Sequence, residues 1–125
     1  MLEDDSDDRY LTKEVLEDLG FELHINFYSN SNELFSGISI TKPDLFLVDY
    51  NSTPENGVNV LRKLKKDDAF KFIPVVMLSD GGAAKYRQQC YSEGASAFVV
   101  KPSSMEETKQ KIKSFFTYWT EVAEL

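Results

Sequence analysis

Five side chains with complementary chemistry stand directly after apolar segments of this 125-residue chain: Glu3, Asp4, Asp49, Ser79 and Lys101. Crowded carboxylates repel one another unless a cation offsets their charge. A hard divalent ion such as Mg²⁺ does so through a few carboxylates while keeping some of its waters. A lysine ammonium suits phosphoryl oxygens, and a carboxylate can act as a nucleophile to give an aspartyl phosphate. Brought together, this set is suited to phosphoryl transfer, which asks mainly for positioning and charge neutralisation.

Four segments predict the strands that would position these side chains. The first, "FELHINFY" at 21–28, alternates apolar and polar residues, as a half-exposed edge strand does. The other three, "LFLV" before Asp49, "IPVVML" before Ser79 and "SAFVV" before Lys101, are continuous apolar runs. Continuous runs are typical of interior strands in parallel sheets, where helices cover both faces.

Helical patterns alternate with these strands. We expect helices over 9–19 with Gly20 as the left-handed cap, after Asn30, after Gly57, over about 83–93, and over about 104–123. This alternation predicts a doubly wound parallel α/β sheet. Ligands bind such sheets beyond the carboxyl ends of the strands, so the five side chains should meet at one rim.

The strand expected before Glu3 has little room, because only Met1 and Leu2 precede the acidic run. The first strand is therefore expected to be truncated in this chain, and we expect a few apolar residues before Met1 in the native protein.

Composition narrows the class of protein. The formal net charge of −7 argues against binding to nucleic acid. A single cysteine fits a reducing cytosol, and no apolar run reaches membrane-spanning length. We expect a soluble cytoplasmic protein with one domain over residues 1–125.

Four motifs, in order, match a known family: "LEDDSDDR", "LFLVDYNSTPENG", "PVVMLSD" and "GASAFVVKP". The chain resembles the receiver domain of two-component response regulators, the CheY-like proteins, over essentially its whole length. The resemblance implies a flavodoxin-like (βα)5 fold with parallel strand order 2-1-3-4-5.

The resemblance assigns roles to individual residues. Asp49 would be the phosphoacceptor, and Ser79 and Lys101 would contact the phosphoryl group. The Mg²⁺ ligands would be Glu3, Asp4, Asp49 and the backbone carbonyl of Asn51. Ser79 and the aromatic Phe98 would form the switch that reports phosphorylation, and the bond between Lys101 and Pro102 is commonly cis in such domains.

The resemblance also implies partners. The phosphoryl group would come from a histidine kinase or a histidine phosphotransfer protein, and the signal would pass to an unknown downstream protein by binding. The surface of the fourth helix, fifth strand and fifth helix would serve for homodimerisation. The tail "FFTYWTEVAEL" is similar to the C-terminal helix of stand-alone receivers that partner phytochrome-like sensor kinases. Such a domain catalyses only its own phosphorylation and dephosphorylation.

Several residues depart from the family pattern. Thr53 stands where the family usually has proline, with Pro54 one position later, and Asp80 stands where the family has a small residue. A carboxylate there should hinder an anionic phosphodonor. Asp5, Asp7 and Asp8 are expected to be solvated residues at a helix start.

Two alternatives remain open from the sequence. The first is a receiver-fold docking or dimerisation module that works without phosphorylation. The second is a phosphatase with an aspartate nucleophile, which needs a second aspartate two residues later as general acid. Asn51 occupies that position and disfavours the second alternative.

Overall fold

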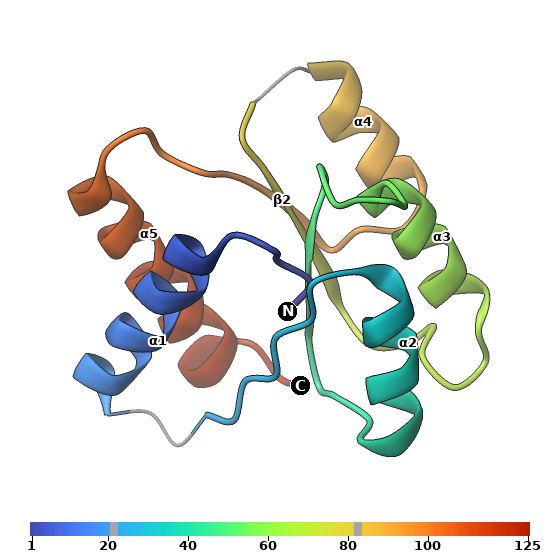
Figure 1. Ribbon diagram of the computed structural model, residues 1–125, viewed down its shortest axis with the longest axis horizontal. Helices are drawn as coiled ribbons and strands as arrows, with labels where there is room; N and C mark the ends of the chain where they lie inside the picture. The colour runs from blue at the N-terminus through green and yellow to red at the C-terminus, as the bar shows by residue number, and fades with distance from the viewer. Residues whose placement is uncertain (21–22, 82–83) are drawn as a thin grey trace.

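The computed structural model describes residues 1–20, 23–81 and 84–125, and helices lie on both sides of a parallel sheet (Figure 1). The elements in chain order are α1 Ser6–Leu19, α2 Ser31–Ile40, β1 Phe46–Asp49, α3 Gly57–Lys66, β2 Val75–Ser79, α4 Ala84–Ser92, β3 Ala97–Val100, α5 Met105–Thr117 and the π-helical η1 Tyr118–Val122. Helices α1 and α5 cover one face of the sheet, and α2, α3 and α4 cover the other. The expected doubly wound α/β fold is confirmed.

The regular sheet has the order β1-β2-β3, and both pairings are parallel. Asp49 lies opposite Leu78, and Ser79 lies opposite Val100. The register therefore brings the ends of β1 and β2 and the start of the segment after β3 to one rim. Every residue of β1 is buried, as its continuous apolar run predicted.

The truncated first strand is a single residue in the sheet. Leu2 forms parallel bridges to Tyr28 on one side and Val48 on the other. The Leu2 N–H donates to the Leu47 carbonyl at 2.7 Å, and the Leu2 carbonyl accepts from the Asp49 N–H at 3.1 Å. The extended segments thus lie in the order Tyr28, Leu2, β1, β2, β3, which matches 2-1-3-4-5.

The prediction of a strand over 21–28 is wrong for the residues that the structure describes. Residues 23–27 form no ladder, and only Tyr28 is bridged; residues 21 and 22 lie outside the described part. An edge strand needs hydrogen bonds from a neighbour, and here the neighbour is Met1–Glu3 alone. The Met1–Glu3 segment forms hydrogen bonds only with Asn26 and Tyr28 among the described residues of this stretch. These hydrogen bonds are too few to form a strand.

Local capping signals were read correctly. Asn30 Oδ1 accepts from the Glu33 N–H, and the Glu33 carboxylate accepts from the Ser29 N–H, both at 2.9 Å. Asn30 is the N-cap of α2, and the Glu33 carboxylate closes the turn on the residue before the N-cap, a variant of the capping box. Gly20 ends α1 with φ +67°, a conformation in which a residue with a Cβ is strained.

Two apolar clusters form the core, one on each face of the sheet. The larger includes Leu34 of α2, Leu61 and Leu64 of α3, and the inner residues Val48 and Val75. The smaller gathers Leu16, Leu47, Val76 and Phe116, with Phe115 and Trp119 packed against it. Three aromatic residues of the tail thus contribute to this cluster, whereas Tyr118, Val122 and Leu125 are exposed. No helix in the described ranges has the length and apolar character needed to cross a membrane.

Candidate functional site

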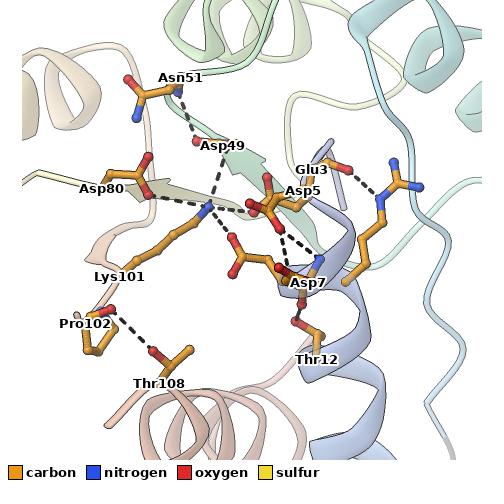
Figure 2. A network of polar contacts seen from close by, with 12 residues as sticks. Glu3, Asp5, Asp7, Thr12, Asp49, Asn51, Asp80, Lys101, Pro102 and Thr108 are labelled. Atoms are coloured by element: carbon orange, nitrogen blue, oxygen red, sulfur yellow. Dashed lines mark hydrogen bonds and ion pairs between the residues drawn. The ribbon is translucent and has the colours of Figure 1, made fainter. Parts of the chain in front are cut away.

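The side chains singled out in the sequence converge at the carboxyl rim of the sheet, and Figure 2 shows Lys101 reaching toward Glu3, Asp49 and Asp80. Glu3, Asp4 and Asp49 each offer a carboxylate oxygen, and these oxygens lie within 4.8 Å of one another. Glu3 and Asp49 are buried, while Asp4 is exposed. The predicted acidic group is thus a real cluster in space.

Asp49 is held rigidly at the end of β1. Its side chain is 8% exposed, and its Oδ1 accepts a hydrogen bond from the Asn51 N–H at 3.0 Å. The loop behind it folds back closely, because Gly57 N–H donates to the Tyr50 carbonyl at 3.0 Å. A Cβ at Gly57 would lie 2.3 Å from the Asp49 carbonyl oxygen. Glycine is therefore required there for the loop to close on Asp49.

Lys101 is surrounded by carboxylates. Its Nζ lies 2.6 Å from Glu3 Oε1 and 3.7 Å from Asp49 Oδ2. Two further oxygens, from Asp8 and Asp80, lie at 3.1 Å and 3.9 Å. The Lys101 N–H donates to the Ser79 carbonyl at 2.8 Å, so the backbone of β2 positions the lysine. One ammonium thus carries the positive charge amid several negative ones.

Burial shapes the ionisation of this cluster. It raises the pKa of Glu3 to about 8; the neighbouring Asp49 adds to the rise, and Lys101 opposes it. Burial alone would lower the pKa of Lys101. Its hydrogen bond to Glu3, together with the charges of Glu3 and Asp49, outweighs that effect and raises the pKa of Lys101 above its ordinary value. Lys101 is therefore a permanent cation at neutral pH.

The residues at the rim fit a divalent cation. Glu3 Oε2 is buried and has no hydrogen-bond partner among the described residues 1–20, 23–81 and 84–125, which is costly for a carboxylate oxygen. The donor set consists of carboxylate oxygens, the ligands that Mg²⁺ prefers. A metal ion beside Glu3, Asp4 and Asp49 would satisfy the unpaired oxygen and offset the burial and the neighbouring Asp49, which together raise the pKa of Glu3.

Ser79 ends β2 at the rim and Phe98 lies within β3, opposite Met77, and the polar groups of both are engaged elsewhere. Ser79 is 2% exposed, and its hydroxyl donates to the Gly81 carbonyl at 2.7 Å while accepting from the Gly81 N–H at 3.2 Å. Phe98 is partly buried against the larger core cluster, and its N–H donates to the Tyr91 hydroxyl at 3.2 Å. The hydroxyl is thus folded back onto its own turn.

Sequence reasoning missed two members of the site. Asp8 was expected to be a solvated helix-start residue, yet it accepts a hydrogen bond from Lys101. Asp80 was expected only to repel donors, yet it also pairs with Lys101. Asp5 does cap α1, accepting from the N–H groups of Asp7 and Asp8. The helical position of Asp8 points it at the rim, and only the placement of α1 against the sheet reveals this.

The peptide-bond expectation is also corrected. Within the described residues the cis bond is Thr53–Pro54, and the bond between Lys101 and Pro102 is trans. The displaced proline in the loop behind Asp49 is therefore accommodated in the cis form.

Comparison with known proteins identifies the family. The response regulator receiver domain matches residues 1–113, so the chain belongs to this family. Receiver domains are signalling domains rather than classical enzymes, and they bind Mg²⁺ in an acidic pocket. The acidic cluster here has the composition of such a pocket.

Curated relatives include regulators from several kingdoms. The two-component response regulator ARR7 of Arabidopsis thaliana is 32% identical over 60% of this chain and 36% of its own length. The transcriptional regulatory protein CrdR of Helicobacter pylori is 30% identical over 93% of this chain and 53% of its own. The chain spans little more than a third of the plant regulators that it matches.

Solved structures show the same fold. The response regulator from Hahella chejuensis is 28% identical, with a TM-score of 0.91 over 99% of this chain and 95% of that one. The Mn²⁺-bound regulator Rcp1 and the phosphorylated cyanobacterial phytochrome regulator RcpA both give a TM-score of 0.93, at 21% and 24% identity. Each of these two matches covers 99% of this chain and 94% of the matched regulator.

Proposed function

We propose that residues 1–125 form a response regulator receiver domain that accepts a phosphoryl group on Asp49. The observation that carries this proposal is the juxtaposition of a buried strand-end carboxylate, a lysine ammonium 3.7 Å away and two further carboxylates within 4.8 Å. Phosphoryl transfer needs a nucleophile, neutralised charge and positioning. This rim offers all three.

The transfer is a substitution at phosphorus. A carboxylate oxygen of Asp49 attacks the phosphorus of a phosphohistidine on a histidine kinase or phosphotransfer protein. The phosphorus–nitrogen bond breaks, and the imidazole leaves with its electron pair and takes up a proton. Mg²⁺, held by Glu3, Asp4, Asp49 and the Asn51 carbonyl, would supply charge neutralisation when bound. Hydrolysis of the resulting aspartyl phosphate returns the domain to rest.

Lys101 and Ser79 act on the phosphoryl group. The ammonium of Lys101 already lies beside Asp49 and needs only a small adjustment to bind a phosphoryl oxygen. The Ser79 hydroxyl must leave the Gly81 carbonyl, which it now contacts at 2.7 Å. That rotation is the conformational change that Phe98 would follow, shifting the surface of α4, β3 and α5.

The signal then passes by binding. The altered surface would engage a downstream protein or a second copy of the chain in the cytoplasm. The proposed source of the phosphoryl group is a sensor kinase of the phytochrome type, on the likeness of the tail at 115–125 to receivers that partner such kinases.

A phosphorylation-independent docking module is the second candidate function. The ammonium of Lys101 is already hydrogen-bonded to Glu3 and Asp8, so the rim can persist as a structural ion-pair cluster. The two functions differ in one measurable property, which is acceptance of a phosphoryl group.

Incubation with acetyl phosphate and Mg²⁺ tests the proposal. We expect the intact protein to gain the mass of one phosphoryl group, to gain nothing in excess EDTA, and to gain nothing after Asp49→Asn. An unchanged mass of the wild-type protein under these conditions, with an established receiver domain labelled alongside it, would favour the docking module.

A further inference from the structure

The carboxylate of Asp8 has no part in the reaction described above, although it lies beside Lys101. Asp8 Oδ2 accepts a hydrogen bond from Lys101 Nζ at 3.1 Å. The oxygens of Asp49 and Asp80 lie farther from the same atom, at 3.7 Å and 3.9 Å. Asp8 is thus a nearer partner of the ammonium than the proposed phosphoacceptor.

The first turn of α1 holds Asp8 in place. Asp5 accepts from the Asp8 N–H at 3.1 Å, and Thr12 donates its hydroxyl to the Asp8 carbonyl at 2.8 Å. A carboxylate in the first turn is also favoured by the helix dipole. The next residue, Arg9, donates from Nε to the Glu3 carbonyl at 2.6 Å, which ties α1 to the rim. Asp8 is therefore a fixed hydrogen-bond acceptor.

A lysine ammonium has three protons to donate. Two of them are directed at Glu3 and Asp8, which leaves the third for Asp49 and Asp80, the two carboxylates farther from the ammonium. A metal ion at the rim would engage the carboxylate of Glu3. Asp8 would then be the partner that still holds the ammonium in its orientation.

We propose that Asp8 is a positioning residue, which acts through Lys101 by holding the ammonium so that its free proton faces the phosphoryl group on Asp49. This inference rests on the proposed function. Asp7 carries the same charge on the same helical turn but is exposed. A comparison of Asp7 with Asp8 therefore separates the contact with Lys101 from the effect of negative charge alone.

Chemical reactivity of Lys101 tests the contact without metal or phosphate. In EDTA, acylation of Lys101 by an N-hydroxysuccinimide acetate, followed by peptide mass, should be about threefold faster in Asp8→Ala than in wild type, because a partly exposed ion pair is lost. Asp7→Ala is the matched control and should leave the rate unchanged. Equal rates in the two variants would overturn the contact.

Phosphorylation kinetics test the consequence. With acetyl phosphate and Mg²⁺, Asp8→Ala should lower the maximal labelling rate of Asp49 about threefold or more, as expected for loss of one charge-assisted hydrogen bond. The half-saturating acetyl phosphate concentration should shift no more than in Asp7→Ala. Asp8→Asn keeps an acceptor oxygen and should recover part of the rate.

A double-variant measurement completes the test. In a Lys101→Met background, Asp8→Ala should have no further effect on the labelling rate, because its partner is gone. An undiminished effect there, or identical maximal rates in Asp8→Ala and Asp7→Ala, would overturn the inference. Absence of labelling in the wild-type protein would instead overturn the proposed function, and the acylation result would still decide the contact.

Discussion

The most unusual residue environment in this protein is that of Glu3. Its carboxylate is fully buried and binds Lys101 through one oxygen, and the other oxygen has no partner in the described part of the chain. Burial of a charge is tolerated where a partner or a metal compensates it. Glu3 is therefore the residue at which metal binding should have its largest effect on ionisation.

A pH-dependent response to Mg²⁺ follows from the raised pKa of Glu3. Burial raises the pKa of Glu3 to about 8 in the metal-free folded protein, whereas the pKa of a glutamate in an unfolded chain is about 4.3. The folded state thus holds more protons in this window, and the free energy of unfolding falls as pH rises through it. Metal binding requires the ionised carboxylate. The increase in Tm caused by Mg²⁺ should therefore be larger at about pH 8 than at about pH 6.5.

Differential scanning calorimetry with and without Mg²⁺ measures this difference. Glu3→Gln is the control, since it cannot ionise, and its response should be weaker and nearly flat with pH. A wild-type response of equal size at both pH values would show that Glu3 does not titrate on metal binding.

The charge of Asp80 should weaken the binding of an anionic phosphodonor. Its side chain is 72% exposed and stands 3.9 Å from Lys101 Nζ, so its charge faces any approaching anionic donor. Asp80→Ala should lower the half-saturating acetyl phosphate concentration by about threefold at low salt, and screening should shrink the difference at high salt. Asp68→Ala, which removes a charge from a side chain 94% exposed, is the control. A salt-independent difference would exclude the electrostatic explanation.

At the scale of elements, the loop between β1 and α3 fixes the proposed phosphoacceptor. Gly57 is the first residue of α3 and abuts the backbone of Asp49 and Tyr50. The loop also holds Ser52, whose hydroxyl donates to the Glu55 carbonyl at 2.7 Å. The position of Asp49 therefore depends on backbone packing as well as on the strand.

Gly57→Ala tests this dependence. Helix propensity alone would make alanine stabilising by up to about 1 kcal/mol. The contact of 2.3 Å with the Asp49 carbonyl should reverse the sign and destabilise the fold by about 1–3 kcal/mol. Urea unfolding measures the change, with the exposed Asn59→Ala in the same helix as control. A stabilised Gly57→Ala variant would mean that the loop yields without cost.

The sequence predicted most elements well because their signals are local. Capping residues such as Asn30 and Ser104 act within one helical turn, and the structure has both in place. Continuous apolar runs identified β1, β2 and β3. The expected helix over 83–93 is α4, Ala84–Ser92, and Ala83 lies outside the described residues. The segment 23–27 was misread because alternation predicts a strand only where a neighbour is present to pair with it.

The sequence predicts the site residues that directly follow a strand, because the carboxyl ends of parallel strands lie at the same rim of the sheet. Glu3, Asp4, Asp49, Ser79 and Lys101 all follow extended segments, so their convergence required only the parallel topology. The contact of Asp8 with Lys101 required the rotation of α1 about its own axis. To predict that the Ser79 hydroxyl turns toward Gly81, the conformation of the following loop must be known. Residue types alone give neither this conformation nor the rotation of α1.

At the scale of the whole molecule, Leu2 links the segment at Tyr28 to the edge of the sheet at β1. It is fully buried and bridges Tyr28 to Val48, so the segment before α1 is integral to the fold. The same segment carries Glu3 to the rim. Stability and site assembly are thus linked through three residues at the start of the chain.

Leu2→Ala should destabilise the protein by about 2–5 kcal/mol, the usual cost of truncating a fully buried leucine. Ile40→Ala, at a side chain 86% exposed, should change the free energy of unfolding by less than about 0.5 kcal/mol. Chemical denaturation compares the two. A Leu2→Ala variant as stable as Ile40→Ala would show that the Met1–Glu3 segment is dispensable to the fold.

Direct mapping of the modified residue is the sharpest test of the central claim. After incubation with acetyl phosphate and Mg²⁺, borohydride reduces an aspartyl phosphate to homoserine, and fragmentation of the peptide locates the change. We predict conversion at Asp49 and at no neighbouring carboxylate. Conversion at another residue, or none in a protein that binds Mg²⁺, would contradict Asp49 as the phosphoacceptor.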